Sequence, residues 1–328
     1  MSHRGGGRAN CRRCRAIGNS VGASVVAVMV ALPTLLRAQR APPAVLLVLP
    51  ASARAQALGN AYVAIPRDEA VVFYNPAQLA TVSHTSVGAG VQRYLASSIL
   101  ATLAVAGRAG PGAVGVGLEA LDFGSEAEVV PDPASNGETG LPTGARISAG
   151  EYIATLGYAV SLGRLRVGAA GKFVGERLAG EAGRALSADL GAAATLPHDV
   201  EVAVSAQQIG GALRLLGSSS PLPRVTHLGA SAPIGVRGPL SLLAVAMISW
   251  PRGAPVDESG GIEVAYSVGK EAWYFLRAGA TSRSSGGSLL SPVSVGGGIA
   301  RAHLQLDYAY QALDGIGGSH RLGLRWWR

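Results

Sequence analysis

The sequence predicts an all-β protein, a transmembrane antiparallel β-barrel of about fourteen strands with a short helical N-terminal plug. Three observations support this fold class. Segments of roughly ten residues alternate in polarity after residue 84, no apolar run beyond the N-terminus is long enough for a membrane helix, and short and long connections alternate. We expect a signal peptide at 1–38, a plug segment at 39–83 and the barrel at 84–328.

The composition is typical of membrane strands rather than of a soluble enzyme. Charged residues make up only 15% of the 328 residues, and glycine occurs 46 times. Such an apolar chain is not disordered, and without long apolar runs it cannot form a bundle of membrane helices. The net charge of +8 includes six arginines in the first 38 residues. The rest of the chain is therefore nearly neutral, and we expect no nucleic-acid partner.

The first 38 residues resemble an export signal, with a basic start, an apolar run over 21–36 and Arg37-Ala38-Gln39 at its end. We expect cleavage near Ala38. A second apolar run at 45–49 precedes Ala51-Ser52-Ala53, so cleavage after Ala53 is an alternative. An uncleaved anchor helix is a further interpretation.

The only two cysteines, Cys11 and Cys14, lie in this leader. Their spacing therefore predicts no metal or redox site in the exported protein.

The segment between the signal and the first strand is the candidate plug. Asp68 to Tyr74 is predicted as a short helix with Asp68 as its N-cap. Asn75-Pro76 ends it, because a residue before proline favours extended backbone.

The barrel prediction rests on segments that have one apolar and one polar face. In 303–311, Leu304, Leu306 and Tyr308 point one way, and Gln305 and Asp307 the other. The segments that read as strands are 84–92, 97–108, 112–123, 151–161, 165–178, 185–196, 199–209, 223–233, 239–249, 258–268, 273–282, 292–301, 303–312 and 320–328. Their even number is typical of a bacterial single-chain barrel.

Connection lengths indicate which end of the barrel faces outward. Tight joints, such as 109–111 and 162–164, alternate with longer ones, such as 124–150 and 210–222. Because periplasmic turns are short and surface loops long, 131–146 and 210–222 are assigned to the cell exterior.

A soluble β-sandwich would also alternate, but its polar face would carry many lysines. Lys172 and Lys270 are the only two here. The apolar face is therefore interpreted as facing outer-membrane lipid. Aromatic residues that could form a girdle at the membrane boundary are Tyr152, Tyr158, Trp273, Tyr274, Tyr308 and Trp326.

Lumen-facing positions are often small, and they leave room for a channel, a ligand cavity or a plugged pore. These positions include Gly157, Gly168, Ala170, Gly191 and Gly279. Inward-facing charged residues are expected to pair with one another, and they are Glu151, Asp189, Glu201, Glu263, Arg277, Asp307 and Arg321. The histidines are dispersed and no nucleophile motif is present, so we expect no enzyme, no metal and no cofactor.

The run LPASARAQALGNAYVAIPRDEAVVFYNPAQLA, residues 49–80, resembles the N-terminal signature of PorV/PorQ-like outer-membrane proteins, relatives of the FadL transporters. Similar stretches are GEYIATLGYAVSLGRLRVGAAGKFV and LDYAYQALDGIGGSHRLGL, so the resemblance covers almost the whole exported chain. The chain departs from the usual aromatic ending of such proteins, because Arg328 follows Trp326-Trp327.

The resemblance implies a bacterial outer-membrane barrel with its N-terminal segment folded inside. The role that the sequence favours is PorV-like, that of a type IX secretion component that receives or anchors exported cargo proteins at the cell surface. The alternative is a FadL-like channel for hydrophobic compounds, and a purely structural barrel is a third class. The implied plug or gate residues are Gly59, Asp68, Phe73, Tyr74, Asn75, Pro76 and Ala77. For Asn75-Pro76-Ala77, a plain turn without a ligand is the alternative.

Overall fold

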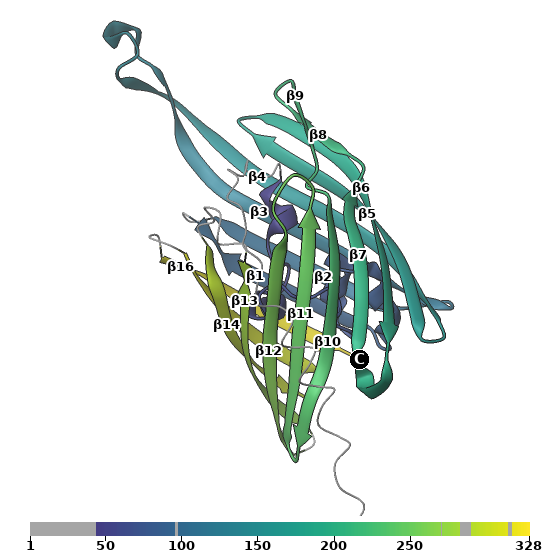
Figure 1. The fold of residues 1–328 in the computed structure, drawn as a ribbon. Helices are drawn as coiled ribbons and strands as arrows, with labels where there is room; N and C mark the ends of the chain where they lie inside the picture. The colour runs from purple at the N-terminus through teal and green to yellow at the C-terminus, as the bar shows by residue number, and fades with distance from the viewer. Residues whose placement is uncertain (1–43, 96–97, 270, 283–289, 314–316) are drawn as a thin grey trace, which may run out of the picture. The chain divides into compact units, whose positions relative to one another are not determined.

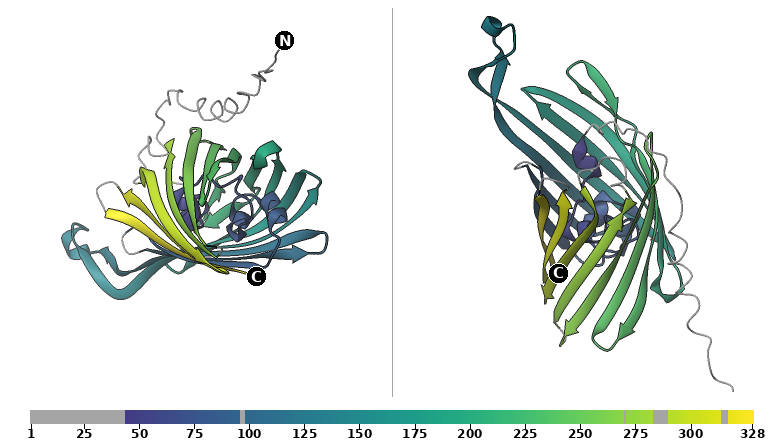
Figure 2. Two further views of the ribbon diagram at one scale, coloured as in Figure 1. Left: turned by 90° about the horizontal axis from the view of Figure 1, so that it is seen from below. Right: turned by 60° about the vertical axis from the view of Figure 1, so that its left-hand side comes forward.

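The computed structural model describes residues 44–95, 98–269, 271–282, 290–313 and 317–328. The predicted signal peptide lies outside these residues. A closed antiparallel barrel forms the body of the described chain, and helical segments lie within it (Figures 1 and 2).

The barrel has fourteen strands, as the sequence predicts. They are β1 (Ser86–Arg93), β2 (Ile99–Ala109), β3 (Gly112–Pro131), β4 (Gly140–Leu162), β5 (Leu165–Leu178), β6 (Glu181–Thr195), β7 (Glu201–Ile209), β10 (Val225–Arg237), β11 (Leu240–Pro251), β12 (Asp257–Val268), β13 (Ala272–Thr281), β14 (Leu290–Arg301), β15 (Leu304–Leu313) and β16 (Gly317–Trp327). Each strand pairs with its neighbours along the chain, and β1 pairs with β16 to close the sheet.

The strands are amphipathic with a period of two. In β15, the side chains of Leu304, Leu306 and Tyr308 point outward and are 48%, 51% and 41% exposed. Gln305 and Asp307 point inward and are both 7% exposed. Since the apolar side is the exposed one, this pattern is that of a membrane barrel and not of a β-sandwich. In the described part of the chain, no helix combines the length and apolar character needed to cross a membrane.

Two predicted surface loops are wrong in detail. The segment 124–150 is mostly strand, because β3 and β4 continue past the barrel rim as a two-stranded arm with η5 (Pro133–Ser135) at its tip (Figure 1). β2 stops pairing with β3 at Asp122, and β5 stops pairing with β4 at Ala149. Beyond these points both faces of the arm are exposed, so the polarity alternation that signals a strand is lost.

The segment 210–222 likewise contains a hairpin instead of an irregular loop. β8 (Ala212–Leu215) and β9 (Ser218–Pro221) pair only with each other in a separate two-stranded sheet. At the opposite end of the barrel the joints are tight, as predicted. There η6 (Pro197–Asp199) links β6 to β7.

The plug segment contains η1 (Val45–Val48), α2 (Ala53–Ala57), η2 (Glu69–Phe73) and η3 (Pro76–Thr81), all inside the barrel (Figure 2). The helix predicted at 68–74 is confirmed as the 3-10 helix η2. The Asp68 carboxylate caps it and accepts a hydrogen bond from the Ala70 N–H at 2.9 Å. The main hydrophobic core is the contact between this segment and the inner wall.

Candidate functional site

The plug rests on glycines of the inner wall. A Cβ on Gly279 of β13 would lie 2.1 Å from the backbone N of Gly59, and one on Gly168 of β5 would lie 2.6 Å from the backbone N of Ala77. Other wall glycines in such close contact with the plug are Gly88, Gly115, Gly117, Gly191, Gly229, Gly261 and Gly296. The small lumen residues seen in the sequence therefore accommodate the plug and do not line an open pore.

Asn75 fixes the turn between η2 and η3. Its Oδ1 accepts a hydrogen bond from the Ala77 N–H at 3.0 Å, and its Nδ2 donates to the Val63 carbonyl at 3.1 Å. The backbone of Asn75 is extended, as expected for a residue before Pro76. Its side chain is fully buried, so these bonds link two passes of the plug where no water can replace them.

Polar wall side chains hold the plug backbone at several points. Gln207 of β7 donates to the carbonyls of Phe73 and Tyr74 at 2.9 and 2.6 Å. Ser231 of β10 donates to the Ala64 carbonyl at 2.9 Å. Arg321 of β16 donates to the carbonyls of Pro50 and Ala51. The plug is thus attached to strands on several sides of the lumen.

Aromatic rings fill the middle of the plug. Tyr62 and Tyr74 pack with their ring centroids 4.9 Å apart. The Tyr74 hydroxyl accepts a hydrogen bond from the Ala51 N–H at 2.7 Å. Phe73 is 6% exposed and lies against Gly117 of β3.

Seven charged side chains join the plug to the wall, and we call them the charge network: Arg54, Asp68 and Glu69 from the plug, with Glu263, Arg277, Asp307 and Arg325 from the wall. Arg54 forms a two-pronged pair with Glu263 of β12, with both N–O distances 2.8 Å. Arg277 of β13 bridges Glu263 and Asp307, at 2.6 Å to each.

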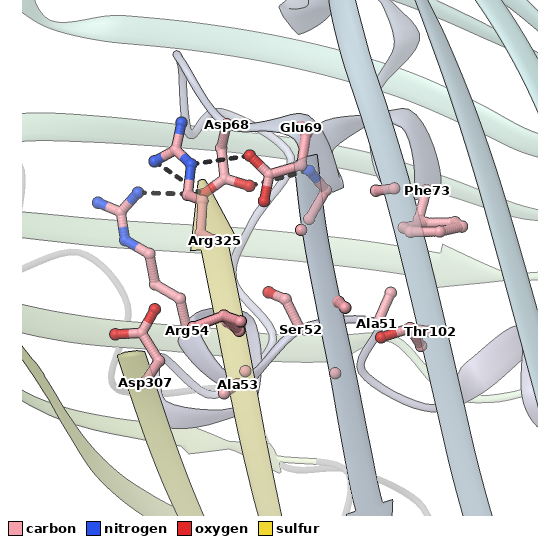
Figure 3. A pocket seen from close by; sticks show the side chains of 17 residues that line it. Ala51, Ser52, Ala53, Arg54, Asp68, Glu69, Phe73, Thr102, Asp307 and Arg325 are labelled. Carbon is pink, nitrogen blue, oxygen red and sulfur yellow. Dashed lines mark hydrogen bonds and ion pairs between the residues drawn. The ribbon is translucent and has the colours of Figure 1, made fainter. Parts of the chain in front are cut away.

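On the other side of the charge network, Arg325 of β16 binds Glu69 at 2.8 Å and lies 4.0 Å from Asp68 (Figure 3). Asp68 also accepts a hydrogen bond from the Tyr62 hydroxyl at 2.6 Å. Because the network contains four carboxylates and three arginines, one negative charge is left without its own cation.

The two neighbouring carboxyls of the plug have different pKa values. Burial raises the pKa of Asp68, but Arg325 and Arg54, with the Tyr62 hydrogen bond, outweigh it and lower that pKa below its usual 3.8. At Glu69, burial and the negative charge of Asp68 outweigh Arg325 and raise the pKa to about 7. Glu69 is therefore the carboxyl of the network that takes up a proton most readily, and its protonation removes the excess negative charge.

A small cavity of about 40 Å³ lies between the charge network and the plug. Its lining includes Ser52, Arg54, Asp68, Phe73 and Arg325 (Figure 3). A cavity of this size holds a few water molecules. Beside it the plug packs directly against the inner wall.

The predicted internal pairing is confirmed for five of the seven lumen charges and is wrong for Glu151 and Arg321. Arg166 pairs with Glu201, and Lys172 pairs with Asp189 at 2.7 Å. Glu263, Arg277 and Asp307 belong to the charge network. The remaining two, Glu151 and Arg321, bind backbone groups of the plug segment and have no charged partner. Among the described residues, no three metal-ligating side chains gather in a way that could hold a metal ion.

The structure separates the residues that the sequence singled out. Asp68 and Phe73 line the cavity, whereas Gly59, Asn75, Pro76 and Ala77 lie against the wall as anchors. Sequence reasoning missed Glu69 and Arg325. The signal for Arg325 was present, because Arg321, Gly323 and Arg325 are alternate residues of one strand and share its inner face.

No protein-family model matches the chain, and no curated protein matches it. Solved structures do share its fold. The Ralstonia pickettii toluene transporter TbuX superposes with a TM-score of 0.55 at 14% identity, covering 84% of this chain and 96% of that one. The Pseudomonas putida toluene transporter TodX gives 0.55 at 11%, with coverage of 84% and 96%. A Pseudomonas aeruginosa FadL homologue gives 0.52 at 10%, with coverage of 85% and 98%.

These likenesses show a FadL-type outer-membrane barrel fold. They support the predicted relation to FadL transporters and give no support to the predicted resemblance to PorV/PorQ proteins. Together with the lipid-facing exterior, the fold makes this chain a bacterial outer-membrane protein.

Proposed function

We propose that the chain is a passive outer-membrane channel for hydrophobic small molecules, with residues 51–83 as its gate. The observation that carries this proposal is a lumen filled by a segment that combines apolar packing with many polar contacts to the wall, namely hydrogen bonds and ion pairs. A filler that served stability alone would need no such set of breakable polar contacts, since well-packed apolar residues would do as well.

The type IX secretion role, favoured on the sequence alone, is not adopted. It rests only on the resemblance of residues 49–80 and of the strand sequences, and nothing in the described part of the lumen supports it further. The proteins of similar fold are described as toluene transporters and as a FadL homologue, which supports the alternative that the sequence left open.

In this proposal, opening requires the plug to release the charge network. Arg325 is the wall residue that contacts both Asp68 and Glu69. Replacing it with methionine keeps most of the side-chain volume and removes the cation. We expect Arg325→Met to weaken the closed state, because two buried carboxylates then face each other without it.

The test is uptake of toluene by a Gram-negative host that lacks channels of this kind. Wild-type protein is expected to raise the uptake rate over the empty host, and Arg325→Met is expected to raise it further. Arg301→Met, at an exposed site at the end of β14, is the matched control. Uptake equal to that of the empty host, with the barrel shown to be present in the outer membrane, would refute the proposal.

A further inference from the structure

A second hydrophobic site lies in the lumen beyond the plug's main body. The η1 residues Val45, Leu46 and Leu47 pack there against apolar side chains of five adjacent strands, of β8 and of the residue that follows β9. These wall residues, which we call the outer chamber, are Leu100, Leu121, Ile153, Val174, Ala185, Leu213 and Leu222. These wall residues are buried, and Leu46 of the short apolar turn VLLV, which belongs to the same cluster, is 1% exposed.

One carboxylate faces this apolar chamber. Glu151 of β4 is 5% exposed and accepts hydrogen bonds from two backbone N–H groups of the turn, Val45 at 3.0 Å and Leu46 at 2.7 Å. The turn is therefore held in two ways, by apolar packing on its side chains and by a carboxylate on its donors. A buried carboxylate without such donors would be costly.

A second carboxylate lies beside the first. Glu176 of β5 is directly opposite Glu151 in the strand register. Side chains so placed are neighbours, and like charges there repel. Within the described residues, neither carboxylate forms an ion pair with an arginine or lysine. The polar end of the outer chamber is thus anionic and suited to a cation or a hydrogen-bond donor.

We propose that the outer chamber binds a hydrophobic ligand whose head group donates hydrogen bonds, a protonated amine above all. In the structure described, residues 45–48 occupy the position that this ligand would take. The inference rests on the proposed channel function and names the class of compound that the channel would select. A carboxylate such as a fatty-acid anion would bring a third negative charge to Glu151 and Glu176, whereas an ammonium group would neutralise one.

One of the two predicted signal-cleavage sites would leave the outer chamber empty. The alternative signal-cleavage site after Ala53 would remove residues 45–48 from the exported protein. The chamber would then keep its apolar wall and lose both donors to Glu151. In a chain cleaved near Ala38, the same residues would compete with the ligand for the chamber.

The test compares octylammonium with octanoate, two probes with equal tails and opposite charges. Each is titrated calorimetrically into the protein in lipid nanodiscs, with empty nanodiscs subtracted and the N-terminus identified by mass spectrometry. We expect octylammonium to bind roughly tenfold more tightly, since a charge-assisted hydrogen bond contributes about that much. The double variant Glu151→Gln/Glu176→Gln should abolish the preference, and Glu128→Gln, on the exposed arm, should keep it.

Equal binding of the two probes, or a preference that survives the double variant Glu151→Gln/Glu176→Gln, would overturn the inference. Toluene uptake measured on the same variants separates this failure from failure of the channel itself: uptake without charge preference refutes only the ligand class. In a chain found to retain residues 44–50, Leu46→Gln should loosen the turn and tighten octylammonium binding. No change there would also count against the inference.

Discussion

Gly279→Ala is the substitution that most sharply tests how the plug is seated. The new Cβ would lie 2.1 Å from the backbone N of Gly59 and 2.2 Å from the carbonyl carbon of Leu58. Non-bonded heavy atoms pack at about 3.5 Å, so the plug backbone must move by more than about 1 Å. Gly59 has little room to move away, because it lies against the Ala280 backbone.

Overpacking of this kind costs about 2 kcal/mol, which corresponds to roughly a thirtyfold rise in the population of the undocked plug. Hydrogen exchange of the amides in residues 53–83, followed by mass spectrometry, measures that population. The matched control is Gly171→Ala on β5, where nothing lies within 4 Å of the new Cβ. Equal protection of the plug in Gly279→Ala and in wild type would refute the seating of the plug on wall glycines.

Three further predictions concern buried polar groups. The folded-state pKa of Glu69 is about 7, above its usual 4.5, so the stability of the docked plug should fall by about 3 kcal/mol as the pH rises from 4.5 through 7. Thermal unfolding at pH 5 and pH 8 should show this fall. Glu69→Gln should make the stability nearly independent of pH in this range. Asn75→Ala removes two buried hydrogen bonds and should cost about 2–3 kcal/mol, read as faster protease cleavage of the plug, whereas unchanged cleavage would contradict its role. Lys172→Met leaves the fully buried Asp189 carboxylate without its cation and should lower the stability of the barrel by about 3–5 kcal/mol. The double variant Lys172→Met/Asp189→Leu should have a melting temperature close to that of the wild type.

The barrel could be predicted from the sequence because its signal is local. Each membrane strand alternates between lipid and lumen, as Leu304 to Tyr308 do, and tight turns separate the strands. The arm formed by the ends of β3 and β4 was missed for the same reason. Above the rim both faces meet solvent, so the alternation of side chains carries no strand signal there.

The charge network could not be predicted, because its pairs are distant in sequence. Arg54 and Glu263 are 209 residues apart, and their contact depends on the register of every strand between them and on the path of the plug. The alternation along the strands indicated that Glu263, Arg277 and Asp307 face inward, and these three do pair. It could not show that Arg54 and Glu69, from the plug, would complete their environment.

The most direct test of the closed lumen is ion conductance in a planar bilayer. We predict no steady open state for the wild-type protein, because the plug packs against the inner wall and is hydrogen-bonded to several of its strands. Deleting residues 54–80 should give a large, steady conductance through the same barrel. A large steady conductance of the wild-type protein, unchanged by that deletion, would contradict the account.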